Sequence, residues 1–220
     1  MKDNHYESAP ECAAQSIRRM IVTGEISPGQ RLIETELAPR LNVSRNTLRE
    51  SYRLLSRDGL VTHLHNRGVF VNRPGLPEII DAFHVRRTIE TQALIESHAD
   101  HPATRRMQKA AEDGLQASKI PDWQAVGTAD VEFHGAVVAL ADSPILDSLY
   151  AALSAQLRLM FDVLGNPEYV HMKFIDRNVD IARMVLDGDG RGAADSMRRY
   201  LLEAEAQITG AYVSGRVHAW

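Results

Sequence analysis

The chain is poor in the residues that support redox chemistry, thiolate metal sites or membrane insertion. Its 220 residues include a single cysteine, Cys12, which cannot form an intramolecular disulfide and cannot hold a metal alone. No stretch approaches the roughly 20 consecutive apolar residues that a membrane-spanning helix needs. The first ten residues are polar and lack the apolar run of a signal peptide. We therefore expect a soluble cytoplasmic protein.

The composition is that of an ordinary globular protein, but the charge is unevenly distributed. Hydrophobic residues make up 44% and charged residues 25%, enough for one large domain or two modest ones. The net charge of -4 combines two opposite parts. Residues 1–73 carry 11 Lys and Arg against 8 Asp and Glu, whereas residues 74–220 carry 14 against 21. A basic N-terminal part of an acidic protein indicates affinity for phosphates there.

Periodicity and turn residues predict three helices and a hairpin in the first 73 residues. We expect the helices at 10–23, 35–41 and 44–58, and Ser44 is well placed as the N-cap of the third. The β-branched runs at 60–64 and 69–72 flank a polar tip and predict the hairpin. Helices joined by a tight turn and followed by a hairpin indicate a winged helix-turn-helix.

The rest of the chain has helical spacing and no strand signals. Two prolines and a glycine fall within residues 73–77, so we place the domain boundary there, with 74–77 as the linker. We expect a mainly α protein, with the winged helix-turn-helix at 1–73 and an all-helical bundle for ligand binding and dimerisation at 78–220. The expected helices of the bundle are 78–99, 102–118, 123–140, 145–164, 168–186 and 191–212.

The third expected helix has the side chains of a recognition helix. Such a helix lies in the major groove and presents its N-terminal residues to base edges. Arg45 and Arg49 share one helical face with Thr47 between them, whereas we expect Arg53 and Arg57 on a solvated face. The wing tip adds polar groups that can reach the minor groove or the sugar-phosphate backbone. The candidate DNA-binding residues are Thr35, Ser44, Arg45, Thr47, Arg49, His65, Asn66, Arg67 and Gly68.

The same part of the chain resembles the GntR superfamily of bacterial regulators. The resemblance is carried by the runs GEISPGQRL at 24–32, ELA at 36–38, NVSRNTLRE at 42–50, DGLV at 58–61 and NRGVFV at 66–71. It extends from about Ile17 to Val71 without a gap. Thr47 stands where the family often has proline, and Tyr52 where leucine is common. The resemblance implies binding to operator DNA.

The C-terminal half resembles the FCD ligand-binding domain of the FadR subgroup. The resemblance rests on VRRTIE at 85–90, DVEFH at 130–134 and the Gly188-Asp189 pair before the last helix. It implies a divalent metal of the zinc or nickel type, held by one Asp and three His beside an arginine that faces the ligand. Asp130 and His134 match the first two metal positions, and Arg86 matches the arginine.

The other two metal positions fall on Asn178 and Tyr200, which replace imidazole poorly. His171 lies two turns before Asn178 and is a possible substitute ligand, so a metal site remains one alternative. Another alternative is that His134 is an ordinary hydrogen-bonded core histidine. We favour a metal-free pocket for an organic effector with a carboxylate. The candidate effector-binding residues are Arg86, Asp130, His134, Asn178 and Tyr200.

These features predict a sequence-specific transcriptional regulator, expected to repress, whose binding to double-stranded operator DNA responds to an organic-acid effector. A single helix-turn-helix has a small interface, so we expect a homodimer on two half-sites. The alternatives are a metal-independent activator that responds to an acyl or other ligand, a protein-interaction module, and a metal-dependent hydrolase built on Asp130 and His134. The chain has no nucleophile elbow, His-Glu-x-x-His run or phosphate loop, so we expect no catalytic residues.

Overall fold

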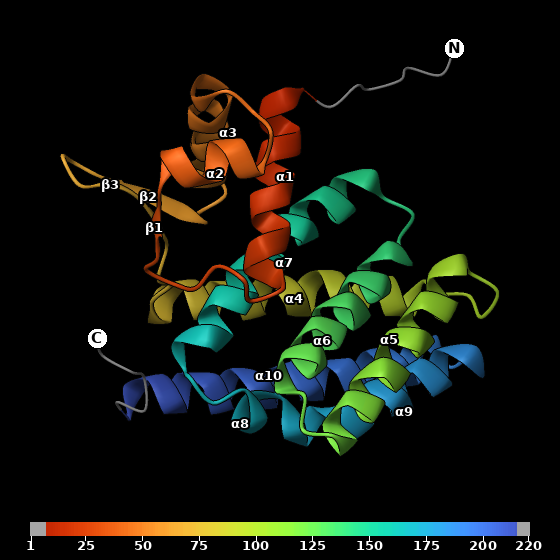
Figure 1. Ribbon diagram of the computed structural model, residues 1–220. Helices are drawn as coiled ribbons and strands as arrows, with labels where there is room; N and C mark the ends of the chain where they lie inside the picture. Colours follow the sequence, from red (N-terminus) through yellow and green to blue (C-terminus); the bar gives the residue numbers. More distant parts are fainter. Residues whose placement is uncertain (1–7, 215–220) are drawn as a thin grey trace, which may run out of the picture. The chain divides into compact units, whose positions relative to one another are not determined.

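The computed structural model describes residues 8–214, and the chain divides into two compact units between Arg73 and Pro74. The protein is mainly helical, as expected, and the strands found in the described residues all belong to the first unit (Figure 1). None of the helices within residues 8–214 is long and apolar enough to cross a membrane.

The first unit combines three helices with a small antiparallel sheet, in the strand order β1-β3-β2. The expected hairpin is confirmed, because His63 of one strand faces Val69 of the other. The sequence reading missed the strand that pairs Arg31 with Phe70, since two residues are too short to show alternation. The elements are α1 (Ala9–Val22), β1 (Arg31–Leu32), α2 (Glu34–Arg40), α3 (Arg45–Arg57), β2 (Val61–Leu64) and β3 (Gly68–Val71).

Helices α1 and α3 pack together and form the core of the first unit. Ile17 and Ile21 of α1 and Leu48 and Leu55 of α3 are completely buried, and their spacings of four and seven residues keep each pair on one helical face. Because this face of α3 is used for packing, its opposite face lies in solvent.

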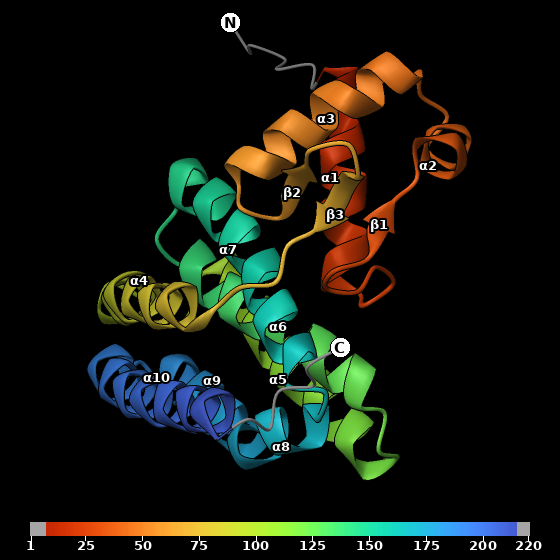
Figure 2. The same ribbon diagram turned by 90° about the vertical axis from the view of Figure 1, so that its left-hand side faces the viewer.

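The second unit is a helical bundle in which α4 lies beside α10 and α5 beside α6 (Figures 1 and 2). Leu76 and Pro77, which we expected in the linker, are the first residues of α4, because Gly75 caps the helix and proline is tolerated in a first helical turn. The elements are α4 (Leu76–Ile95), α5 (Pro102–Lys119), α6 (Trp123–Ala139), α7 (Pro144–Val163), α8 (Pro167–His171), η1 (Met172–Phe174), α9 (Ile175–Leu186) and α10 (Gly190–Val213).

The prediction of a single helix at 168–186 is wrong, since the chain forms α8, a 3₁₀ turn and α9 there. The interruption buries His171 and Phe174, which are only 4% and 3% exposed. The His171 ring packs edge-on against Phe161, with the ring centres 5.4 Å apart. No glycine or proline marks the break, so tertiary packing decides it and the local sequence gives no signal.

Candidate nucleic-acid interface and buried polar cluster

The N-terminus of α3 is fixed by its cap. The hydroxyl of Ser44 accepts a hydrogen bond from the backbone N–H of Thr47 at 3.0 Å, and the two hydroxyl oxygens lie 2.8 Å apart. Such a cap satisfies one of the backbone donors that a helix start leaves unpaired. Arg45 and Arg49 are exposed on this ordered turn, whereas Thr47 is half-buried. The cap therefore fixes the backbone of the helix end that carries the two arginines.

Arg49 is held from one side by an acidic residue of α2. Its Nε donates to Oε1 of Glu34 at 2.9 Å, and this hydrogen bond together with the negative charge raises the pKa of Arg49. None of the contacts found in residues 8–214 uses the two Nη groups of Arg49. Since these two groups form the fork that pairs with guanine or phosphate, Glu34 orients Arg49 without occupying the fork. Thr35, the next residue along α2, is exposed.

Farther along α3, the arginines behave differently. Arg53 donates to Glu50 on its own helix at 2.7 Å, with 73% of the arginine side chain exposed. Arg57 is also exposed, in the last turn of the helix. An exposed pair of this kind stabilises a helix by a few tenths of a kcal/mol at most. Arg53 is therefore a suitable control for the two arginines at the N-terminal end.

The wing carries its four candidate residues at an exposed tip (Figure 1). Asn66 and Gly68 have positive φ angles of 58° and 105°, which explains the residue types at these turn positions. The sequence analysis did not predict that Arg31 of β1 lies beside the wing tip. Its Nε is 3.3 Å from the position that a Cβ atom on Gly68 would occupy. Arg31 and Arg67 thus give the wing two cations.

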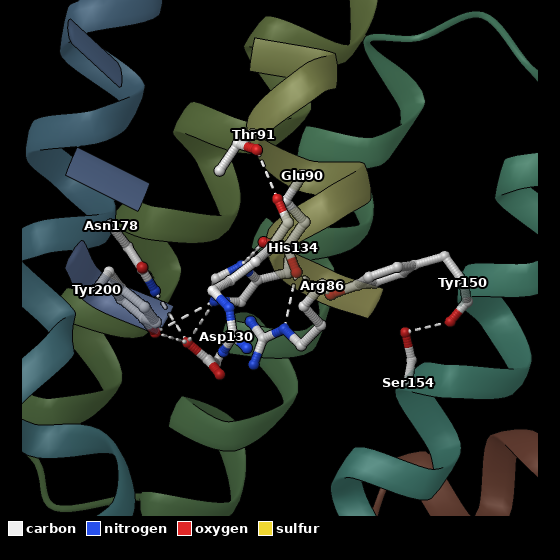
Figure 3. A network of polar contacts seen from close by, with 10 residues as sticks. Arg86, Glu90, Thr91, Asp130, His134, Tyr150, Ser154, Asn178 and Tyr200 are labelled. Atoms are coloured by element: carbon white, nitrogen blue, oxygen red, sulfur yellow. Dashed lines mark hydrogen bonds and ion pairs between the residues drawn. The ribbon is translucent and has the colours of Figure 1, made fainter. Parts of the chain in front are cut away.

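In the second unit, the five candidate effector residues come together in the interior of the bundle (Figure 3). Oδ1 of Asp130 accepts hydrogen bonds from the Asn178 amide at 3.0 Å and from the Tyr200 hydroxyl at 3.2 Å. Nε2 of His134 lies 3.2 Å from the same hydroxyl. Arg86 is 2% exposed and interacts electrostatically with Asp130. The structure thus places side chains from four helices in one polar cluster.

Two residues of the cluster were missed as site residues. Glu90 is completely buried and accepts hydrogen bonds from Nε of Arg86 at 2.7 Å and from the Tyr150 hydroxyl at 3.1 Å. Its other oxygen lies 2.6 Å from Nδ1 of His134. An arginine followed four residues later by a glutamate is a recognisable helical ion pair, so the sequence carried a signal for Glu90. For Tyr150 it carried none.

The carboxylates of the cluster are ionised despite their burial. Burial alone would raise the pKa of Glu90, but Arg86 and His134 outweigh it and bring the pKa below its ordinary value. Burial likewise opposes the ionisation of Asp130, yet His134, His171 and Arg86 hold its pKa far below the usual range. The arrangement is therefore an internal salt-bridge network.

A second ion pair lies next to the cluster. Nε of Arg158 is 3.0 Å from Oδ1 of Asp162. His171 interacts electrostatically with Asp162, and its Nδ1 lies 3.6 Å from Oδ2 of Asp130. Burial raises the pKa of Asp162 although Arg158 opposes the rise. A Cβ at Gly127 would lie 2.6 Å from Nη1 of Arg158. Glycine is therefore the residue that leaves room for this guanidinium.

The donor set does not fit the metal that the resemblance implies. Oδ1 of Asp130 already accepts two hydrogen bonds, and Asn178 and Tyr200 supply an amide and a phenol where imidazoles are expected. His171, the possible substitute, lies with Nδ1 3.6 Å from Oδ2 of Asp130. Within residues 8–214 there is no group of three or more His, Cys, Asp or Glu side chains arranged to hold a metal ion.

Comparison with known families divides the chain in the same way. The family of bacterial regulatory proteins called gntR matches residues 11–71, and the FCD domain matches residues 81–203. These matches include α3, the wing and the polar cluster.

Individual relatives are also regulators. A solved structure from a Rhodococcus species, described as a GntR transcriptional regulator, is 34% identical, has a TM-score of 0.85 and covers 94% of this chain and 100% of its own. The transcriptional repressor RspR of Escherichia coli is 25% identical over 200 residues, or 87% of this chain and 85% of that protein. The galactonate operon repressor of Escherichia coli is 27% identical over 168 residues, or 67% of this chain and 73% of that protein. The relatives and domains belong to regulators, which confirms the expectation that the chain is not an enzyme.

Proposed function

The chain belongs to the GntR family of transcriptional regulators with an FCD domain, and on this premise we propose that it represses transcription by binding a two-fold symmetric operator as a homodimer. The observation that carries the proposal is the pair Arg45 and Arg49, exposed on a capped helix end whose other face is buried in the core. Two relatives are named as repressors, which supports repression over activation.

In this proposal α3 enters the major groove and the wing contacts the backbone or the minor groove. Arg45 and Arg49 contact base edges, while Ser44, Thr47 and Thr35 lie close to phosphates. At the wing tip, polar side chains and an exposed glycine backbone can approach the DNA closely. The wing residues of the interface are His65, Asn66, Arg67 and Gly68, with Arg31 beside them.

The test of this function is selection of binding sites from random duplexes with the purified full chain. We expect an enriched motif made of two inverted half-sites, because a symmetric dimer presents two copies of α3. A motif with a single half-site would contradict the dimer, and the absence of any enriched motif would contradict sequence-specific binding.

We further propose that the polar cluster around Asp130 binds the effector without a metal. The cluster groups cationic and anionic side chains with hydroxyl and amide groups in the bundle interior, and such convergent polar groups are typical of small-molecule sites. Binding there changes the helical unit, and the change reaches the first unit through the short connection before Leu76, so that the two wings of the dimer lose their fit to the half-site spacing.

Metal content tests the metal-free part of this proposal. The chain, purified without chelators, should contain far less than one zinc or nickel ion per molecule by elemental mass spectrometry. A matched double variant, Asn178→His with Tyr200→His, restores imidazoles at both positions and should bind zinc. About one transition metal per wild-type chain would show that Asp130 and His134 hold a cation after all.

A further inference from the structure

The positive charge of Arg86 is already compensated within the polar cluster, without a ligand. Glu90 and Asp130 are ionised and contribute two negative charges, whereas Arg86 contributes one positive charge. These three side chains together carry one negative charge in excess, and the rings of His134 and His171 lie beside the two carboxylates. The guanidinium of the neighbouring Arg158 is likewise paired with a carboxyl group, that of Asp162. Arg86 therefore has no uncompensated positive charge to offer a simple anion.

Two side chains of the cluster nevertheless each have a polar atom without a partner. Within the part of the chain that the structure describes, Nη2 of Arg86 and Oδ1 of Asn178 are buried and make no hydrogen bond. Both side chains are more than nine-tenths buried and converge on Asp130 (Figure 3). Buried polar groups in native proteins are almost always satisfied, so such atoms indicate a further partner. One atom is a donor with a positive charge, and the other is a neutral acceptor.

We propose that the effector is a zwitterion of the amino-acid class, whose carboxylate accepts from Nη2 of Arg86 and whose ammonium group donates to Oδ1 of Asn178. This inference rests on the proposed function of the cluster as the effector site. The ligand's ammonium then lies on the side of Asn178 and Asp130, where the carboxylate of Asp130 favours a cation.

The balance of charge decides between this class and a simple organic acid. A ligand with only a carboxylate would add an uncompensated negative charge to the interior, which is costly even beside one arginine. It would also leave Oδ1 of Asn178 without a donor. A hydroxy acid supplies that donor but still adds the charge. A zwitterion satisfies both atoms and adds no net charge.

The experiment compares ligands that differ in one group on the wild-type chain. The common L-amino acids are screened by thermal unfolding, and each one that stabilises is compared with its 2-hydroxy acid and with the acid that lacks the amine. We expect at least one amino acid to raise the Tm by about 5 °C or more at a hundred-fold excess over its Kd. The two matched acids should bind at least about tenfold more weakly by calorimetry.

Variants then locate the site. Asn178→Leu removes the acceptor at similar volume and should weaken the amino acid at least about tenfold while leaving the weak binding of the matched acid unchanged. Gln116→Leu, an exposed position on α5, is the control and should change neither. The thermal unfolding curve of each variant shows whether it is folded before its affinity is compared.

The outcomes separate this inference from the proposed function. If the acid without the amine binds as well as the amino acid, or if no amino acid binds, the inference is overturned. If such an acid binds and Arg86→Lys weakens it, the cluster remains the effector site. If a ligand binds Arg86→Lys and Asn178→Leu as tightly as it binds the wild-type chain, the cluster is not the effector site. The proposed effector site and the proposed effector class are then both overturned.

Discussion

Replacing Arg45 or Arg49 by alanine is expected to weaken operator binding by about 1–3 kcal/mol each, or about 5- to 150-fold in Kd. Both side chains are exposed and lie outside the core of the first unit, so the fold should survive either change. We expect the larger loss for Arg49→Ala, because it also leaves the carboxylate of Glu34 unpaired beside the phosphates. Fluorescence anisotropy with the selected operator measures both.

Arg53→Ala is the matched control, since it removes the same charge from the same helix. Its guanidinium is paired with Glu50 and lies on the solvated face, so operator affinity should change less than about threefold. Affinity for a duplex of unrelated sequence should fall by a similar small amount in all three variants, because nonspecific binding depends on charge alone. Unchanged operator affinity in both Arg45→Ala and Arg49→Ala would show that α3 is not the recognition helix.

Glu90→Gln is expected to destabilise the helical unit by about 3–5 kcal/mol. The change keeps the shape of the side chain but removes the charge that compensates Arg86, and both residues are almost completely buried. Urea unfolding followed by tryptophan fluorescence measures the effect. Trp123 is the first residue of α6, so its fluorescence reports on the second unit.

Glu203→Gln is the control for this prediction. Glu203 also forms ion pairs, with Lys173 and Arg177, but its side chain is 39% exposed and the pairs are screened by water. We expect a loss of less than about 1 kcal/mol. Equal losses for the two glutamates would mean that the buried network has no special weight in the stability of the bundle.

The same network should make the helical unit sensitive to acid. The pKa values of Glu90 and Asp130 are lower in the folded protein than in the unfolded chain, so at low pH the unfolded chain binds more protons. The stability that these carboxylates contribute is therefore complete above about pH 5 and is lost as the pH falls through the acidic range. The difference between wild type and Glu90→Gln should shrink in the same range.

The fold of the first unit could be predicted because its signals are local. Ser44 as a cap, Gly59 after α3 and the Asn66–Gly68 turn each fix one boundary through backbone chemistry that the sequence displays. Strand β1 could not be predicted, since it exists only through its pairing with β3. The break between α8 and α9 accompanies the burial of His171 against Phe161 of α7. This is a packing contact between two helices, and the backbone chemistry of the break itself does not display it.

The candidate site was predicted only in part. Five candidate effector residues were named from the sequence, and the structure brings their side chains together. They are Arg86, Asp130, His134, Asn178 and Tyr200. The spacing of Arg86 and Glu90 is a sequence signal for an ion pair, but such pairs are common on solvated helix faces. That this pair is buried is a property of the bundle, which the sequence does not display. That pairing compensates the positive charge of an expected anion site, which is the basis of the effector class proposed above.

The most direct test of the account is a titration of the selected operator and of a scrambled duplex with the full chain at low and at physiological salt. We predict that the operator binds about 1,000-fold more tightly or better, that both affinities fall with salt, and that the stabilising amino acid releases the operator. Equal affinity for the two duplexes would contradict sequence-specific regulation by this protein.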